Sequence, residues 1–128
     1  MTPEQRLAAA RIRLRIVFND CGPLGPGKID VLEAVARTGS ISGAGRELGM
    51  SYRRCWLLID AINHMFRQPS VIASAGGAQG GGAQLTPFGE QLVAAYRRVE
   101  AQTRAALKTE FAAFAAEIAD TGEHEEPR

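Results

Sequence analysis

Two short amphipathic stretches that meet at a glycine restrict the fold of this chain more than any other feature. Ser42 is expected to cap a helix that ends at Leu48, because Gly49 suits the left-handed position that follows many helices. Ser51 is expected to cap a second helix that continues to Phe66. Two helices joined by a tight glycine turn, within about 25 residues, are typical of a helix-turn-helix. The inward positions expected on the second helix are Cys55, Leu58, Ile59, Ile62 and Phe66.

The residues before this segment predict a short strand and another helix. Arginines alternate with apolar residues from Arg11 to Phe18, as in a half-buried strand, and these arginines are expected to form a solvated face. Glycines and prolines in residues 19–27 interrupt regular structure. A helix is expected to begin near Pro26 or Lys28 and to end at residues 38–40. Its expected inward face comprises Ile29, Leu32, Val35 and Ala36.

A β-hairpin, which we call the wing, is predicted after the helix-turn-helix. Residues 70–74 are rich in residues that favour strands, and residues 75–84 form a glycine-rich loop. Leu85 and Thr86 are expected to form the returning strand. A proline then favours the first position of a new helix, and the threonine before it is a good cap.

The helix that begins at Pro87 has no breaker before Gly122. At 1.5 Å per residue it would be roughly 45–50 Å long, which exceeds the size of the domain. A second copy of the same helix is the simplest cover for its far end, so a two-fold homodimer is expected. The residues expected at this interface are Leu92, Val99, Leu107, Phe111 and Phe114.

These elements define a mainly α fold, a winged helix-turn-helix with a β-hairpin wing, a short N-terminal strand and a long C-terminal dimerisation helix. Residues 1–10 are expected to form an N-terminal tail and residues 11–86 the winged helix-turn-helix domain. The dimerisation helix is expected to span residues 87–119, and an acidic disordered tail residues 120–128.

The charges are unevenly distributed along the chain. The formal net charge is only +1, but the last twelve residues contain five acids and one base, so residues 1–116 have a net charge of +5. A basic body with an acidic tail is typical of proteins that bind nucleic acids. Two cysteines make neither a disulfide framework nor a zinc pattern, and no apolar run is long enough to span a membrane. We therefore expect a cytoplasmic protein without a metal or cofactor.

The second helix of the helix-turn-helix begins with groups that suit DNA. Ser51 and Tyr52 offer hydroxyl groups to phosphates, and Arg53 and Arg54 lie in the first turn, where base edges are usually contacted. Arginine binds guanine and phosphate equally well, so the sequence leaves the two roles open. Two cations oppose the helix dipole, which favours an anionic partner, although both can be solvated surface charges. Trp56 is expected to pack between this helix and the wing, with a place at the DNA surface as the alternative.

Three stretches in the same order resemble the N-terminal DNA-binding domain of the ModE family of molybdate-responsive regulators, and more distantly the LysR-type regulators. They are PGKIDVLEAVARTGS, GSISGAGRELGMSYRRCWLLID and AGGAQGGGAQLTPFGEQL, and the similarity covers about residues 12–107. The resemblance implies a dimer that docks its recognition helices into successive major grooves, with the wing at the DNA backbone. It implies DNA contacts by Ser51, Tyr52, Arg53 and Arg54.

Two departures from the family pattern change these expectations. The family's wing often carries a lysine, whereas this wing has Gln79 and no charge from Ser70 to Gln84. Its contacts are therefore expected to come from backbone N–H groups and Gln79. The family's molybdate-binding domains follow the long helix, and this chain stops at Arg128. We accordingly expect a regulator without its own sensor domain and do not expect molybdate binding.

The expected function is that of a sequence-specific transcriptional regulator that binds double-stranded DNA on the nucleoid of a prokaryote. Its expected partners are DNA, a second copy of the chain and a separate ligand-sensing protein. No carboxylate pair, nucleophile–base set or metal cluster indicates an enzyme. The alternative is a protein-interaction or dimerisation module that has lost DNA binding. The uncharged wing favours that alternative, whereas Arg53 and Arg54 disfavour it.

Overall fold

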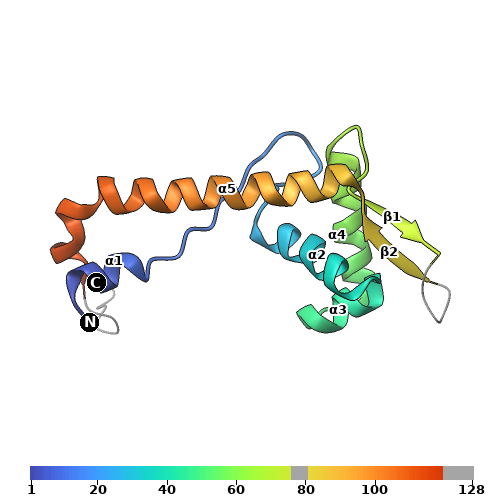
Figure 1. The fold of residues 1–128 in the computed structure, drawn as a ribbon, viewed down its shortest axis with the longest axis horizontal. Helices are drawn as coiled ribbons and strands as arrows, with labels where there is room; N and C mark the ends of the chain where they lie inside the picture. Colours follow the sequence, from blue (N-terminus) through green and yellow to red (C-terminus); the bar gives the residue numbers. More distant parts are fainter. Residues whose placement is uncertain (76–80, 120–128) are drawn as a thin grey trace, which may run out of the picture. The chain divides into compact units, whose positions relative to one another are not determined.

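The computed structural model describes residues 1–75 and 81–119, which fall into two compact units. The larger unit comprises residues 13–99, and the smaller comprises residues 1–12 with the chain from Glu100 onward. The larger unit consists of helices, a two-stranded sheet and the first part of a long helix (Figure 1). Its elements are α2 (Pro26–Thr38), α3 (Ile41–Leu48), α4 (Tyr52–Met65), β1 (Val71–Ser74), β2 (Gly82–Leu85) and the start of α5 (Pro87–Glu110).

Two left-handed glycines fix the turns of the helix-turn-helix. Gly39 (φ +73°) ends α2, and Gly49 (φ +68°) ends α3. The predicted cap of α3 was wrong, because Ser40 rather than Ser42 caps it by accepting a hydrogen bond from the Gly43 N–H (2.9 Å). The turn at Gly39 leaves Ser40 in the extended conformation that a cap residue requires.

Ser51 is confirmed as the cap of α4, since its hydroxyl oxygen accepts a hydrogen bond from the Arg54 N–H (3.1 Å). This cap fixes where the first turn of α4 begins, and so fixes which residues that turn exposes. The helix that follows has 14 residues and ends at Met65.

The core of the larger unit lies where α2, α3, α4 and the wing meet. The buried residues of α4 include Cys55, Ile59 and Ile62, as predicted, and burial raises the pKa of the Cys55 thiol. The prediction for α2 was partly wrong, because Ala36 is exposed. Since α3, α4 and β2 all contact α2, its buried surface is wider than a single stripe. The buried residues of α2 are Ile29, Val31, Leu32, Ala34 and Val35.

The strand predicted for residues 11–18 does not form. A single bridge joins Ile16 to Leu24, with each backbone N–H donating to the other's carbonyl (2.9 and 2.8 Å). The predicted alternation of exposed arginines with half-buried apolar residues is present from residue 11 to residue 16. The segment is held by a side chain rather than by a sheet, because the Tyr96 hydroxyl of α5 donates a hydrogen bond to the Leu14 carbonyl (2.7 Å).

The wing is an antiparallel pair of strands in which Val71 lies opposite Leu85 and Ser74 opposite Gly82. The returning strand begins at Gly82, inside the stretch that was predicted to be loop, because pairing with β1 continues through Ala83 and Gln84.

One side chain of α4 ties the wing to the helix-turn-helix. Asn63 Oδ1 accepts hydrogen bonds from the N–H groups of Ser70 (2.8 Å) and Val71 (3.0 Å). Its Nδ2 donates to the Val71 carbonyl (3.0 Å). The first strand of the wing therefore has a fixed register relative to α4.

Helix α5 begins as predicted, since the Thr86 hydroxyl accepts a hydrogen bond from the Gly89 N–H (2.9 Å). It ends at Glu110 after 24 residues, so the prediction of one long helix over residues 87–119 was wrong. A 3₁₀ helix, η1 (Ala112–Glu117), follows it. The chain turns at Phe111, and the turn buries Ala115 where η1 packs against the N-terminal helix of the smaller unit.

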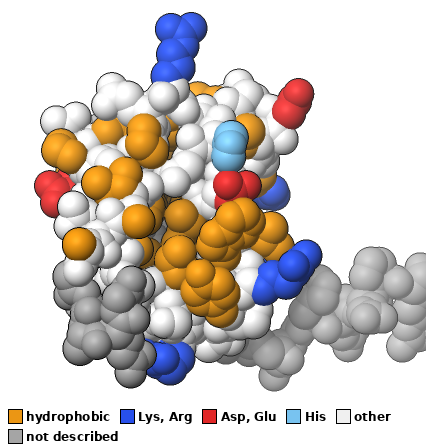
Figure 2. Space-filling view, turned by 90° about the vertical axis from the view of Figure 1, so that its right-hand side faces the viewer, with side chains coloured by type: hydrophobic (Ala, Val, Ile, Leu, Met, Phe, Trp, Pro, Cys, Tyr) orange, Lys and Arg blue, Asp and Glu red, His pale blue; other side chains and the backbone are white. Residues whose placement is uncertain are grey.

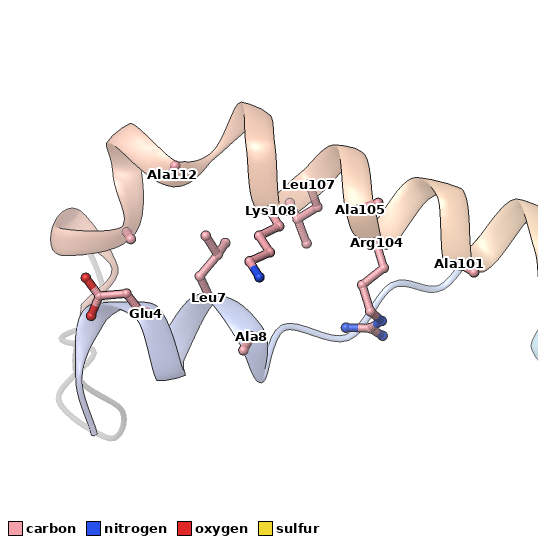
Figure 3. Close-up of a pocket in the computed structure, with 10 residues that line it drawn as sticks. Glu4, Leu7, Ala8, Ala101, Arg104, Ala105, Leu107, Lys108 and Ala112 are labelled. Atoms are coloured by element: carbon pink, nitrogen blue, oxygen red, sulfur yellow. The ribbon is translucent and has the colours of Figure 1, made fainter.

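That N-terminal helix, α1 (Pro3–Ala8), was missed in the stretch expected to be a tail. Thr2 and Gln5 form a reciprocal capping box around Pro3 at the first helical position, a signal that the sequence contains. The helix, η1 and the end of α5 surround a groove of about 560 Å³ that includes Leu7 and Leu107 (Figure 3). Among the helices of residues 1–75 and 81–119, none has the length and apolar character to cross a membrane.

Candidate nucleic-acid interface

The first turn of α4 presents all four residues that the sequence singled out. Ser51, Tyr52, Arg53 and Arg54 are exposed, and the Tyr52 side chain has 57% of its surface accessible. The Ser51 hydroxyl oxygen accepts the capping hydrogen bond and keeps its own hydrogen to donate. Within the described residues, neither Arg53 nor Arg54 forms an ion pair. No acid occupies this turn, so the turn itself does not neutralise the two cations at the positive end of the helix.

A groove of about 430 Å³ lies between α4 and the wing. Tyr52 and Trp56 line it from α4, and Ile72 lines it from the wing. Apolar side chains gather on the face that contains this groove (Figure 2). Trp56 is 44% exposed, so it forms part of the surface and does not only pack between helix and wing as expected. Trp56 follows Tyr52 by four residues, and this spacing, which is visible in the sequence, places both side chains on the same face of α4.

Two sets of ion pairs hold the other helices around α4. Arg37 of α2 donates to both carboxylate oxygens of Glu47 of α3 (3.0 and 2.7 Å), and this hydrogen-bonded pair lowers the pKa of the Glu47 carboxyl. Arg97 of α5 pairs with Asp30 and Glu33 of α2. Asp30, Glu33 and Glu47 are thus engaged by arginines of the helices around α4.

Gln79, the predicted contact of the wing, lies outside the described residues. In the part of the chain that the structure describes, no group of three or more His, Cys, Asp or Glu side chains is placed to hold a metal ion.

The five residues predicted at a dimer interface fall in different environments. Leu92 is partly buried and packs against the core of the larger unit. Leu107 lines the groove of the smaller unit. Phe111 and Phe114 are 49% and 55% exposed, and their ring centroids lie 5.5 Å apart. Val99 is also exposed, so three of the five offer apolar surface in the single chain.

Comparison with known proteins gives a family and several relatives. Residues 27–90, half of the chain, match the family model for "Bacterial regulatory helix-turn-helix protein, lysR family". The molybdenum-pterin-binding protein MopB of Rhodobacter capsulatus is 49% identical over 78 residues, or 61% of this chain and 29% of that protein. The molybdenum transport protein ModE of Azotobacter vinelandii is 44% identical over 80 residues, or 62% of this chain and 30% of that protein.

A third relative carries DNA binding in its name. The DNA-binding transcriptional dual regulator ModE of Escherichia coli K12 is 37% identical over 71 residues, or 56% of this chain and 27% of that protein. The chain thus spans between 27% and 30% of the length of these relatives. These matches confirm the resemblance that the sequence motifs indicated.

Proposed function

We propose, on the premise that this chain belongs to the lysR family of bacterial regulatory helix-turn-helix proteins, that it binds double-stranded DNA and regulates transcription. In this proposal α4 enters the major groove with its first turn toward the base edges. The observation that carries it is the pair of exposed cations, Arg53 and Arg54, at the positive end of α4, for which residues 1–75 and 81–119 supply no ion-pair partner. The family consists of regulators and not of enzymes, in agreement with the sequence.

Each remaining contact has its own chemistry in this proposal. Ser51 and Tyr52 donate their hydroxyl hydrogens to phosphate oxygens beside the major groove. The wing follows the DNA backbone with its N–H groups and with Gln79. These contacts set the register of the protein on the duplex, whereas Arg53 reads the sequence by bidentate hydrogen bonds to guanine.

The names of the relatives point to the genes involved. MopB and the ModE of Azotobacter vinelandii are named for molybdenum binding and transport, and we propose that this chain controls genes for molybdenum uptake or use. Control by a separate ligand-sensing protein and a location on the nucleoid in the cytoplasm belong to the same proposal. Genome-wide footprinting tests the choice of genes, since bound sites at unrelated promoters alone would contradict it.

Arg53→Ala is expected to weaken specific binding by ~1–3 kcal/mol, because a lost bidentate base contact costs that much. The measurement is an anisotropy titration against a footprinted duplex and a scrambled duplex, each at two salt concentrations. Arg67→Ala is the matched control, since Arg67 is exposed beyond the opposite end of α4. Equal loss on both duplexes would exclude base reading by Arg53. Wild-type protein that shows no salt-sensitive binding to any duplex would instead favour the interaction module.

We further propose that the chain forms a homodimer through the end of α5 and the aromatic pair that follows it. The double variant Phe111→Glu, Phe114→Glu is expected to raise the dimer dissociation constant by roughly 700-fold or more, because buried aromatic anchors each contribute about 2 kcal/mol or more at interfaces, and every 1.4 kcal/mol is tenfold. Sedimentation velocity at micromolar concentration measures it. Val17→Glu, at an exposed apolar position of the larger unit, is the control. A wild-type chain that sediments as a monomer at these concentrations would refute the dimer.

A further inference from the structure

A second groove of the larger unit, which we call the basic groove, lies beside the first turn of α4. It has a volume of about 290 Å³ and is lined by the segment before α2, by the start of α2 and by α4. Four of its lining side chains are cationic and none is acidic. These cations come from three separate parts of the sequence and are Arg13, Arg15, Lys28 and Arg54.

The charges of the basic groove are not neutralised within the described residues. None of its three arginines forms an ion pair there. Lys28 Nζ donates a hydrogen bond to the Pro23 carbonyl (2.7 Å), which fixes the ammonium group without cancelling its charge. Burial lowers the pKa of Lys28, Cys21 opposes this shift, and nearby Arg15 adds to it. An anion in the groove would reduce this mutual repulsion.

The start of α2 adds to the positive potential of the basic groove. Gly25, Pro26 and Gly27 line the groove at the positive end of the helix. This end has neither a side-chain cap nor an acid in its first turn, so no side chain compensates its dipole. Apart from its chain neighbours and the backbone of its own helix, Gly27 also has no described heavy atom within 4 Å of the position of a Cβ, which leaves the backbone open to a close approach.

We propose that the basic groove binds a phosphodiester group of the same duplex whose major groove receives α4. This inference rests on the proposed function and adds a second contact region to it. Arg54 connects the two regions, because it lies in the first turn of α4 and also lines the basic groove. A duplex seated on that turn brings its backbone to the groove, since phosphates border the major groove on both sides. Arg54 thereby contacts phosphate, and Arg53 is left to read bases.

The test is the salt dependence of DNA binding by the double variant Arg13→Gln, Arg15→Gln of this chain. Loss of one phosphate contact lowers the magnitude of the negative slope of log K against log salt by about 0.9, so the slope of the double variant is expected to be less steep by roughly 0.9 to 1.8. Its affinity near 100 mM salt is expected to fall by roughly tenfold or more, equally on specific and scrambled duplexes. Arg67→Gln removes the same kind of charge roughly 20 Å from Arg54, counted along the axis of α4. This variant is expected to retain the wild-type slope.

A second variant separates charge from structure. Arg13→Lys, Arg15→Lys retains both charges and is expected to restore most of the slope, and thermal unfolding verifies that each variant folds. An unchanged slope in the glutamine variant, while Arg53→Ala still loses specificity, overturns the proposed phosphodiester contact in the basic groove. It leaves the proposed DNA-binding function intact. An unchanged slope is also expected if the groove binds free phosphate and not the duplex, and this outcome likewise overturns the proposed contact with the duplex. Absence of duplex binding by the wild type overturns the proposed function itself.

Discussion

Asn63→Leu is expected to lower the free energy of unfolding by about 2–4 kcal/mol, because three hydrogen bonds between α4 and the wing disappear at once. The leucine leaves the N–H groups of Ser70 and Val71 and the Val71 carbonyl without partners in a partly buried place. Urea unfolding followed by circular dichroism measures the loss. Affinity for DNA is expected to fall as well, since the wing loses its fixed register relative to α4.

Asn63→Asp is the matched control for this prediction. Its carboxylate keeps an acceptor for both N–H groups and lacks only the donor to the Val71 carbonyl. Its unfolding free energy is therefore expected to lie between those of the wild type and the leucine variant. If the leucine variant unfolds within about 0.5 kcal/mol of the wild type, the wing is not anchored by this side chain.

Gly89→Ala is expected to destabilise the protein by about 3 kcal/mol or more, because the added methyl group has no space. A Cβ at Gly89 would collide with the carbonyl oxygen of Ser70 and would lie 3.0 and 3.1 Å from its carbonyl carbon and Cα. These are backbone atoms at the start of the wing, so a side-chain rotation cannot relieve the contact. Thermal unfolding is expected to shift downward by roughly 10–20 °C.

Gly27→Ala provides the comparison, since both residues lie in the first turn of a helix and Gly27 has no atom within 4 Å of the added group. This variant is expected to be neutral or more stable by up to about 1 kcal/mol, because alanine reduces the freedom of the unfolded chain. Similar losses in the two variants would mean that helical glycine itself, and not the contact with Ser70, determines the outcome at Gly89.

The sequence predicted the elements whose signals are local. A glycine at a left-handed turn, a serine at a cap and a threonine before a proline depend on a few neighbouring residues, and Gly49, Ser51 and Thr86 act as predicted. The wrong cap predicted at Ser42 also concerns a local signal. Two serines lie two residues apart, and only the preceding turn at Gly39 decides which of them is the cap.

Two further elements were wrongly predicted because they depend on distant partners. Residues 11–18 have the alternation of a strand, but a strand needs a paired edge, and the segment instead contacts α5 through Tyr96. The end of α5 at Glu110 reflects packing of η1 against α1, which no pattern near residue 110 reveals.

For the candidate site, too, the part with local sequence signals was predicted and the part formed by distant residues was not. The exposed residues of the first turn of α4 follow from helical spacing alone and were predicted. The basic groove was not, because Arg13 and Arg54 are distant in sequence and meet only in the folded unit. The arginines of the N-terminal segment were expected to be a solvated face, which is how they appear until their neighbours in space are known.

The hydrogen bond from Tyr96 to Leu14 has a consequence for biosynthesis. It joins residues that are 82 positions apart, and Arg97 joins α5 to Asp30 across 67 positions. A chain emerging from the ribosome N-terminus first cannot close the larger unit until this part of α5 has been made. Contacts of such long range also slow folding. The nascent helix-turn-helix therefore exists for a time without a positioned N-terminal segment, and binding competence arises only after Tyr96 and Arg97 have emerged.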